Sequence, residues 1–509
     1  MAKGKEERKG VDELSAKVIN LAGRRFLIVP NSEIYGGAAG FYDFVGYGAR
    51  IKRNVENAWW GRFVSGRDDV VPMEGSIITN PKVWRASGHL ESFNDPAIDC
   101  AKCKSRFRAD HLIEEELSLS VDGVTMERLE KMMRENKIAC PKCGGALNLI
   151  KTFNLMFKTS IGAGEGSDAE AYLRPETAQV IFANFKAGLG AGRAGPPFGI
   201  AQVGKAFRNE ISPRNFVFRM REFTQMELEY FVNPAKLDDC PSLSEAHLKL
   251  EIPLLTPEMH EKGQPAKKTA VGDALSHKTI GTKWHAYWLA ECVMFIQSLG
   301  VRPENLRARK HSASELSHYS SETWDVEYNY PWGFRELMGV ANRTDFDLRQ
   351  HSAHSGKELT AFDEERKLKY APHVFEPSFG VERLVFTILL DAYSESVQKE
   401  GSTVILKLSP KVAPLHAGVF PLMKKDGLAQ KAREVEKALK AAGLDVEYDD
   451  AGSIGKRYAR MDEVGVPLCI TIDYDTLSND TVTVRDRDTA AQVRVKISEL
   501  AQKIRAGSA

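Results

Sequence analysis

Residues 207–231 read FRNEISPRNFVFRMREFTQMELEYF, and this stretch carries four arginines and four glutamates in a run that otherwise alternates like a β-strand. Successive side chains of a strand point to opposite faces of its sheet. From residue 218 onward one face is largely apolar, with Glu222 and Thr224 as exceptions, and comprises Phe218, Met220, Met226, Leu228 and Tyr230. The other comprises Arg219, Arg221, Phe223, Gln225, Glu227 and Glu229. The pattern predicts a strand with one face in a core and the other forming a polar platform.

The same stretch predicts an antiparallel pair, because FRNE and RMREFTQMELE flank the loop ISPRNFVF. Arg208 and Glu210 are two residues apart and therefore share a face of the first strand. Arginine suits phosphate oxygens, a carboxylate can accept a hydrogen bond from an exocyclic amine, and Phe223 can stack on a base. These residue types indicate a nucleotide site. A ladder of salt bridges on a solvated sheet face is the alternative that the pattern alone leaves open.

The length of 509 residues predicts two or three domains, since one core usually serves about 100 to 200 residues. Apolar residues make up 43% and charged residues 27%, and the net charge of +1 excludes a global basic field but not a local basic patch. The charged N-terminus lacks a signal-peptide core, and no apolar run approaches about 18 residues. We therefore expect a cytoplasmic protein that does not enter a membrane.

The chain shows mixed α/β patterning of the α+β type. A helix at YGARIKRNVENAWWGRFV precedes DVVPMEGSIITNP, which predicts a strand ending at Pro81. Residues 233–282 are polar and aperiodic, so we expect a weakly ordered insertion there. SESVQKEGST, residues 394–403, has the composition of a linker. The alternating helical and strand patterns beyond it predict a separate small α/β domain.

Three stretches in order resemble the signature motifs of class II aminoacyl-tRNA synthetases. FRNE…REFTQMELE is similar to motif 2, EPSFGVERLVFTILL to motif 3, and the helix plus strand ending at Asn80–Pro81 to motif 1, the dimer-forming element. More specifically, SEIYGGAAGFYDFVGYG, NPKVWRASGHLESFNDP, NLMFKT, LRPETAQ, ELSHYSSETWDVEY and RTDFDLRQHSAHSG resemble the glycyl-tRNA synthetases of the dimeric type. The resemblance covers nearly the whole chain.

The resemblance implies a catalytic domain over residues 1–400, built on an antiparallel sheet flanked by helices, with insertions at 100–150 and 233–330. It implies an α/β anticodon-binding domain over residues 403–509. The implied reaction is ATP-dependent attachment of glycine to tRNA(Gly) through glycyl-adenylate, with Mg²⁺ as cofactor and a homodimer as the assembly. Such a reaction needs positioning and charge neutralisation rather than a protein nucleophile.

Three catalytic residues follow from the motif resemblance. Arg208 would contact the α-phosphate, Arg383 the γ-phosphate, and Glu336 both ATP and magnesium. Glu210 would accept a hydrogen bond from the adenine amine, and Phe223 would stack on the base. The implied ATP site as a whole is Arg208, Asn209, Glu210, Phe218, Arg219, Met220, Arg221, Glu222, Phe223, Glu336, Leu337, Gly380, Val381, Glu382 and Arg383.

The implied glycine pocket holds the ammonium group with Glu176, Glu227 and Glu376 and places Ser378 beside the α-carbon. Its further members are Arg108, Phe223, Thr224, Gln225, Met226, Pro377, Phe379 and Gly380. Three clustered carboxylates repel one another, so without glycine at least one should have a raised pKa. Every competing amino acid is larger than glycine, so exclusion by size suffices and no editing is expected.

Two CxxC pairs, Cys100/Cys103 and Cys140/Cys143, have the form of a four-cysteine zinc site. The 36 residues between the pairs predict a helical insertion that loops out between the two knuckles. Unliganded thiols are the alternative. In the C-terminal domain the resemblance implies phosphate contacts to tRNA from Lys456, Arg457, Arg460, Arg485 and Arg487, and an ordinary solvated surface is the alternative there.

Competing functions remain at this stage. Another amino acid of the same subgroup is disfavoured by the RPETAQ and EPSFG carboxylates. A non-catalytic paralogue acting as a tRNA- or DNA-binding subunit would be expected to lose Arg208 or Arg383, and both are present. A zinc-ribbon nucleic-acid-binding protein would leave the charged strands unexplained.

Overall fold

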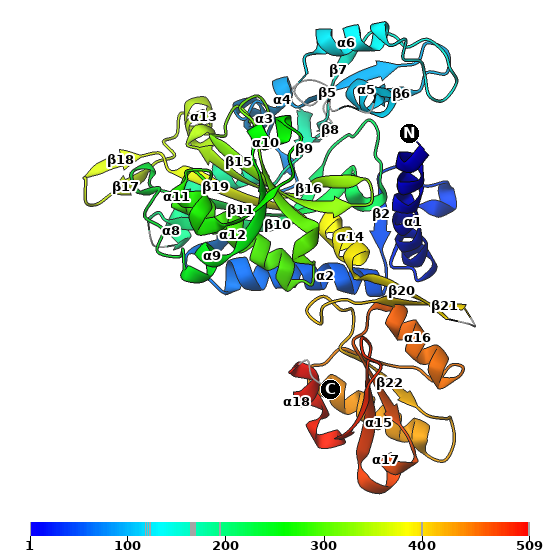
Figure 1. Cartoon of the computed structure of the whole chain (residues 1–509). Helices are drawn as coiled ribbons and strands as arrows, with labels where there is room; N and C mark the ends of the chain where they lie inside the picture. Colours follow the sequence, from blue (N-terminus) through cyan, green and yellow to red (C-terminus); the bar gives the residue numbers. More distant parts are fainter. Residues whose placement is uncertain are drawn as a thin grey trace.

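A nine-stranded sheet forms the centre of the larger part of the molecule (Figure 1). The computed structural model describes residues 2–117, 119, 121, 124–162, 169–192, 195–398 and 401–506. All neighbours in the sheet are antiparallel except β12/β14 and β10/β3. Its order is β13 (Lys267–Ala270), β12 (Glu251–Leu255), β14 (Leu306–Lys310), β15 (Glu322–Tyr330), β16 (Gly333–Thr344), β19 (His373–Gly380), β11 (Glu222–Val232), β10 (Phe198–Phe207) and β3 (Val70–Pro72).

Helices cover both faces of this sheet. The apolar face of β11 contributes Met226, Leu228 and Tyr230 to the main core, which also takes in α2 (Tyr47–Trp60), α12 (Lys283–Ser298) and α14 (Val381–Ala392). A smaller core on the opposite face contains Phe198 and Phe231 together with α7 (Ala178–Ala183), α8 (Phe185–Gly192) and part of α13 (Phe346–Ser355). The strand predicted to border a core on one side therefore lies between two helical layers, and the polar platform occupies the part of the second face that the smaller core leaves free.

The cysteine-bounded insertion forms its own small unit at the top of Figure 1. Its strands β6 (Arg106–Arg108), β5 (Asn94–Asp99) and β7 (Lys151–Asn154) form a three-stranded sheet in that order. The helices α5 (Ala109–Leu117) and α6 (Met126–Glu135) pack on it through a separate core that contains Ile98, Leu112, Ile113, Leu129 and Met133. A second three-stranded sheet has the order β4 (Ile78–Thr79), β9 (Glu170–Leu173) and β8 (Phe157–Ser160).

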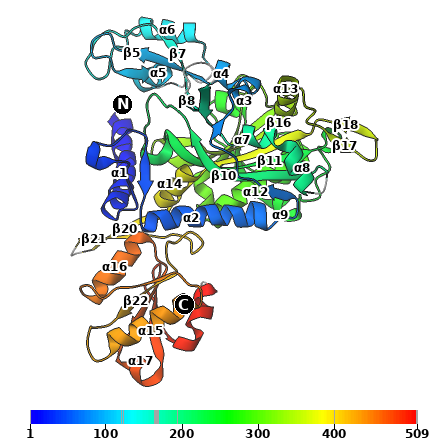
Figure 2. The ribbon, with the colours of Figure 1, turned by 180° about the vertical axis from the view of Figure 1, so that it is seen from behind.

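The C-terminal unit is a five-stranded mixed sheet, seen from both sides in Figures 1 and 2. Its helices are α15 (Leu428–Ala441), α16 (Ile454–Val464), α17 (Tyr474–Asn479) and α18 (Leu500–Arg505), and its strand order is β23 (Val446–Tyr448), β22 (Ala417–Pro421), β24 (Leu468–Ile472), β25 (Thr481–Asp486) and β26 (Gln492–Lys496). Contacts with the first unit include Tyr47 Oη donating to Glu447 at 2.7 Å and Arg24 of α1 (Ala2–Arg24) paired with Glu463 at 2.9 Å. The two units are therefore joined by side-chain contacts as well as by the chain.

Three sequence-based expectations about local structure are corrected. Residues 233–282 are ordered: they supply α9 (Glu245–Lys249), α10 (Pro257–Glu261), α11 (Val271–Ser276) and the edge strands β12 and β13. These elements are too short for a clear period, yet they bury Ile252, Leu254 and Val271. The expected linker lies in two paired strands, β20 (Tyr393–Gln398) and β21 (Gly401–Leu406), with residues 399–400 outside the described part of the chain.

The strand expected after α2 is divided into two. β3 enters the main sheet and ends at Pro72, whereas β4 pairs with β9 and ends at Thr79, just before Pro81 opens α3 (Pro81–Ala86). Asn80 caps that helix, because its side chain accepts a hydrogen bond from the backbone N–H of Lys82 at 2.9 Å. Proline at the first helical position lacks only an N–H that would have no helical partner. The stretch that resembles motif 1 therefore covers α2, β3 and β4.

The start of α2 depends on one glycine. A Cβ atom on Gly48 would lie 1.8 Å from the carbonyl oxygen of Leu27, whereas one on Gly61 would meet nothing within 4 Å. Gly48→Ala is expected to lower the melting temperature, since overpacking against backbone costs about 1–3 kcal/mol. Gly61→Ala, the matched control at the other end of the helix, should leave it unchanged or raise it. Equal melting temperatures for the two variants in differential scanning fluorimetry would contradict this packing.

Candidate active site

The polar platform is built by three neighbouring strands in fixed register. Gln202 on β10 lies opposite Glu227 on β11, and Glu227 lies opposite Ser378 on β19. Side chains two apart on a strand share a face, so Phe223, Gln225, Glu227 and Glu229 point the same way. The pairing of strands far apart in sequence thus brings the motif 2 and motif 3 residues together.

Glu227 occupies the middle of the platform and is 2% exposed. One carboxylate oxygen accepts hydrogen bonds from Ser378 Oγ at 2.7 Å and Gln225 Nε2 at 2.8 Å. The other accepts from the backbone N–H of Thr177 at 3.0 Å and from the Thr177 hydroxyl. Burial, and the nearby charge of Glu176, raise the pKa of Glu227. The sequence-based expectation of a raised pKa in this cluster agrees with these surroundings.

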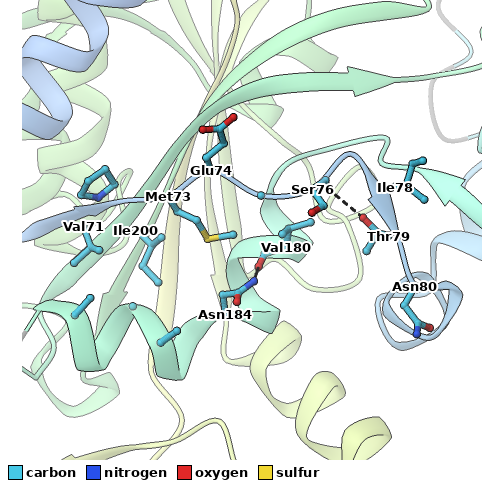
Figure 3. A pocket seen from close by; sticks show the side chains of 15 residues that line it. Val71, Met73, Glu74, Ser76, Ile78, Thr79, Asn80, Val180, Asn184 and Ile200 are labelled. Atoms are coloured by element: carbon cyan, nitrogen blue, oxygen red, sulfur yellow. Dashed lines mark hydrogen bonds between the residues drawn. The ribbon is translucent and has the colours of Figure 1, made fainter.

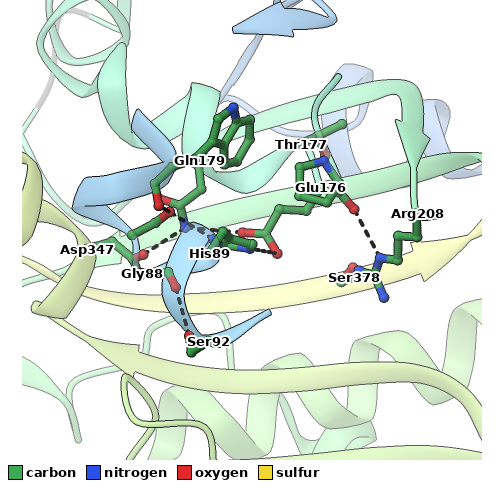
Figure 4. A network of polar contacts seen from close by, with 12 residues as sticks. Gly88, His89, Ser92, Glu176, Thr177, Gln179, Arg208, Asp347 and Ser378 are labelled. Carbon is green, nitrogen blue, oxygen red and sulfur yellow. Dashed lines mark hydrogen bonds and ion pairs between the residues drawn. The ribbon is translucent and has the colours of Figure 1, made fainter. Parts of the chain in front are cut away.

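Glu176 lies beside Glu227 on the loop that leads into α7 (Figure 4). His89 Nε2 is 3.3 Å from one of its oxygens, and Gln179 Nε2 donates to the other at 3.1 Å. Burial alone would raise the pKa of Glu176, but His89, Arg343 and Arg208 lower it overall. Neither His89 nor Gln179 was predicted as a site residue, although both lie in stretches that carry the family resemblance.

Glu376 is held by an arginine that sequence reasoning missed. Arg343 Nη1 donates to Glu376 at 2.9 Å, and the same guanidinium group binds Asp347 at 2.8 and 3.0 Å. The rings of Tyr319 and Phe182 lie over it at 3.9 and 5.2 Å. Burial raises the pKa of Glu376 to about 8, although Arg343 opposes the shift. The sequence feature that could have indicated this arginine is its spacing of four residues from Asp347, at the end of a strand.

Glu229 is a fourth buried carboxylate on the same face. Its side chain has no hydrogen-bond partner in the part of the chain that the structure describes, and it is fully buried. Burial and the charge of Glu376 raise the pKa of Glu229 well above its usual value. A protonated Glu229 avoids the cost of several kcal/mol that a buried unpaired charge would carry. Glu229, which the strand pattern already assigned to this face, thus adds a buried carboxylate to the three predicted for the glycine pocket.

Arg208 lies next to this cluster, at the end of β10. Its guanidinium group is 5.4 Å from the ring centres of both Phe93 and Phe223, and its Nε donates to the carbonyl oxygen of Pro175 at 3.1 Å. Glu210 is buried, with one oxygen 3.9 Å from Arg219. The residues expected to contact the α-phosphate (Arg208), the adenine amine (Glu210) and the adenine base (Phe223) therefore lie close together. In the structure the ring of Phe223 faces Arg208.

Arg383 and Glu336 meet at a cavity of ≈ 800 Å³. Arg383 Nη1 is 3.0 Å from a Glu336 carboxylate oxygen, and the guanidinium group lies 4.7 Å from the ring of Phe218. The cavity is lined largely by charged and aromatic side chains, including Arg219, Arg307, Arg309, Asp325 and Trp332. His111, Glu114 and Glu115 of α5 also line it, so the cysteine-bounded insertion forms one wall. Both its size and its charges suit a polyphosphate ligand.

Several residues predicted to bind glycine or ATP use their side chains in contacts with other parts of the protein. Thr224 and Glu382 bond to each other at 3.0 Å, and Lys52 of α2 binds Glu382 at 2.6 Å. Glu222 pairs with Lys205 at 3.1 Å. The side chains of Met220, Met226, Leu337, Phe379 and Val381 are buried in the core. These residues can contribute to a ligand site through their backbone and by fixing their neighbours.

Arg108, predicted for the glycine pocket, ends β6 directly before α5, the helix that lines the cavity. It binds Asp95 at 2.7 Å and Asp110 at 2.5 Å, and the field of Glu210 acts on it as well. Its hydrogen bonds in the described structure are thus made within the insertion.

Comparison with known proteins finds relatives along nearly the whole chain. Glycine–tRNA ligases of Clostridium kluyveri and Clostridium acetobutylicum are 45% and 44% identical to it, and each alignment covers 95% of the chain and 96% of the relative. The chain belongs to the glycine–tRNA ligase family. The glycine–tRNA ligase of Geobacillus thermodenitrificans is similar at 43% identity, over 96% of the chain and 97% of the relative.

Two further comparisons concern the fold of this glycine–tRNA ligase family member. Residues 412–507 match the family described as an anticodon binding domain. A solved structure of a prolyl-tRNA synthetase from Cryptosporidium parvum has a TM-score of 0.57 at 15% identity, covering 96% of the chain and 76% of that structure. The predicted class II fold and the C-terminal anticodon-binding domain are confirmed. No helix in the described ranges is long and apolar enough to span a membrane.

The four cysteines of this ligase family member converge as predicted. Their sulfur atoms all lie within 4.8 Å of one another, with Cys100–Cys143 at 3.6 Å and Cys103–Cys140 at 3.7 Å. A tetrahedral zinc ion with Zn–S bonds of about 2.3 Å requires sulfur separations of about 3.8 Å. The donor set and its spacing therefore fit a four-thiolate metal.

In the anticodon-binding domain, the predicted basic residues divide into two groups. Arg457 and Arg487 are each 3% exposed and donate to backbone carbonyl groups, at 2.8 Å to Gly452 and 2.9 Å to Leu408 respectively. Arg485 binds Asp462 at 2.9 Å. Lys456 is exposed, and Arg460 is partly exposed beside Asp449. The most exposed members of the predicted set are therefore Lys456 and Arg460, whereas Arg457 on the same helix is buried.

Proposed function

We propose that this protein attaches glycine to tRNA(Gly) in two steps, activation of glycine by ATP to glycyl-adenylate and transfer to the terminal ribose of the tRNA. The observation that carries the proposal is that Arg208 lies within electrostatic reach of both Glu176 in the buried carboxylate cluster and Glu336 at the arginine-lined cavity. A non-catalytic paralogue finds no support, since Arg208 and Arg383 are both present and the relatives are glycine–tRNA ligases.

Recognition of glycine follows from charge and space. Glu176, Glu227 and Glu376 surround a site for one ammonium group, whose positive charge relieves their mutual repulsion. Ser378, held by its hydrogen bond to Glu227, would lie beside the α-carbon of bound glycine and meet any larger side chain there. A larger amino acid would have to displace this hydrogen-bonded side chain, which makes exclusion by size effective.

Activation requires neutralisation of charge on the α-phosphate while the glycine carboxylate attacks it. Arg208 supplies a fixed guanidinium group at that position, and Arg383 binds the γ-phosphate that leaves as part of pyrophosphate. Glu336 has a pKa lowered by Arg383, so it is ionised and suited to help hold magnesium. Magnesium, when bound with ATP, supplies further positive charge for the leaving pyrophosphate.

Amino-acid-dependent ATP–pyrophosphate exchange tests this function. Glycine should support exchange, whereas alanine, serine, proline and threonine should not. Arg208→Ala should reduce exchange by about a hundredfold or more, the usual cost of losing a preorganised donor to a transition state. Arg67→Lys serves as control, because Arg67 also lies among aromatic rings and pairs with an aspartate, Asp69, away from the platform. Exchange with another amino acid, or full exchange by Arg208→Ala, would contradict the proposal.

The pH dependence of glycine binding tests the carboxylate pocket. Glu376 must be ionised to hold the ammonium group, and its pKa is raised to about 8 without ligand. Glycine affinity should therefore rise as the pH increases through about 8, with release of a proton on binding. Titration calorimetry in two buffers of different ionisation enthalpy measures both effects. Glu376→Gln should reduce the proton release, with Glu227, whose pKa is also raised, as the remaining source. Binding that is independent of pH in the unaltered protein would refute this role.

We further propose that zinc is the metal of the cysteine cluster. Four thiolates close the coordination shell, which suits a structural rather than a catalytic ion. The purified protein should contain about one zinc per chain by plasma mass spectrometry, and Cys103→Ser should lose it. Because α5 lines the nucleotide cavity, that variant should also bind ATP more weakly. Cys240→Ala, at a buried cysteine outside the cluster, is the control; retention of zinc by Cys103→Ser would exclude the site.

A homodimer and a cytoplasmic location complete the proposal. β3 is an edge strand of the main sheet, and a cavity of ≈ 500 Å³ beside it is lined by Val71, Met73, Ile78 and Val180 among others (Figure 3). An edge strand and an open, partly apolar surface suit pairing with a second copy. The location is supported by the cysteines, because four that converge as metal ligands and three buried thiols suit a reducing compartment.

A further inference from the structure

His89 is the only histidine in contact with a pocket carboxylate among the residues that the structure describes (Figure 4). Its Nε2 atom is 3.3 Å from Glu176, and its Nδ1 atom is 2.8 Å from the hydroxyl of Ser87. The rings of Trp84 and Phe93 lie 5.5 and 5.3 Å from the imidazole ring. The imidazole is thus fixed on both nitrogens and against two aromatic rings.

The contact distinguishes Glu176 from the other pocket carboxylates. Glu227 is bonded only by neutral donors, and Glu376 is paired with an arginine that Asp347 already neutralises in part. The pKa values of both are raised, mainly by burial, whereas His89 contributes most among the neighbours that lower the pKa of Glu176. The negative charge available to an ammonium group in the empty pocket is therefore concentrated on Glu176.

We infer that His89 is a positioning residue of the glycine pocket, which orients the Glu176 carboxylate toward the ammonium group of the substrate. The inference rests on the proposed function. His89 makes no contact with the reacting atoms and acts through Glu176, as a residue behind a metal ligand orients that ligand.

The segment that carries His89 also reaches the nucleotide side of the site. Phe93, at the end of α4 (His89–Ser92), packs against His89 on one side and lies 5.4 Å from the guanidinium group of Arg208 on the other. Residues 84–93 therefore border both halves of the active site. Loss of the imidazole ring alone leaves Phe93 in place, so its effect should fall on glycine and not on ATP.

The test measures KM for glycine and for ATP in pyrophosphate exchange. His89→Ala should raise KM for glycine about ten- to a hundredfold, the range found when groups that orient ligands are removed, while KM for ATP stays within about twofold. His89→Gln keeps an N–H donor and should recover part of the loss. If His89→Ala does not fold, the KM values of His89→Gln still test the inference.

His247 provides a closely matched control. Its Nδ1 is 2.8 Å from the hydroxyl of Ser244 and its Nε2 is 3.5 Å from Glu291, and its side chain is 10% exposed against 11% for His89. It lies on α9, outside both halves of the site. His247→Ala removes the same kind of contact and should lower the melting temperature to a similar degree without a selective change in KM for glycine.

The pH profile separates positioning from general support of the fold. The charged and titratable groups that act on Glu176 and His89 are Glu227, Glu376, Arg343, Arg208 and His351. Removal of His89 raises the pKa of Glu176, and Glu176 must be ionised to bind the ammonium group. Glu176 ionises at lower pH than Glu376, whose ionisation sets the step near pH 8. The lower step of the acid limb of kcat/KM for glycine should therefore move to higher pH in His89→Ala and remain in place in His247→Ala.

The outcomes are distinguishable. A selective rise in KM for glycine with a displaced acid limb supports the inference. Proportional changes in both KM values, or an effect no larger than that of His247→Ala, would overturn it and leave the proposed function intact. Absence of glycine-dependent exchange in the unaltered protein would instead overturn the proposed function.

Discussion

A buried excess of negative charge is the constraint on which the site depends. Glu176, Glu227, Glu229 and Glu376 converge at the centre of one sheet, where each uncompensated charge would cost several kcal/mol. The structure meets this cost in different ways at each position. An arginine sandwiched by aromatic rings holds Glu376, hydrogen bonds hold Glu227, a histidine and an amide hold Glu176, and Glu229 is suited to remain protonated. The ammonium group of the proposed substrate, glycine, would compensate the remaining negative charge.

On the nucleotide side of the site the fixed charges are positive, and neighbouring side chains hold them in place as well. Arg208 lies between Phe93 and Phe223, and Arg383 lies over Phe218 while pairing with Glu336. Aromatic faces restrict the motion of a guanidinium group without neutralising it. The arginines are therefore held in position before a phosphate arrives, and little reorganisation is needed during the reaction.

Elements remote from the chemistry support these two regions. Lys52 of α2 binds Glu382 at the start of α14, and Glu382 accepts a hydrogen bond from the backbone N–H of Thr224 at 2.8 Å. These contacts of Glu382 connect three elements: α2, which precedes the edge strand β3, the strand β11, which carries Phe223, and the helix α14, which carries Arg383. The insertion that carries the cysteine cluster also contributes α5 to the wall of the cavity.

The sequence alone determined the motif 2 and motif 3 strands, their polar and apolar faces, the cysteine pairing and the two-part organisation, because alternation and spacing are local properties of the chain. It misjudged residues 233–282, whose short strands become ordered only by pairing with distant ones. It also missed His89, Gln179, Arg343 and Asp347, which surround the pocket carboxylates. Their role depends on which side chains meet after folding. Only the tertiary structure decided which ones meet, because the free energy of a buried charge is set by neighbours that lie far away in sequence.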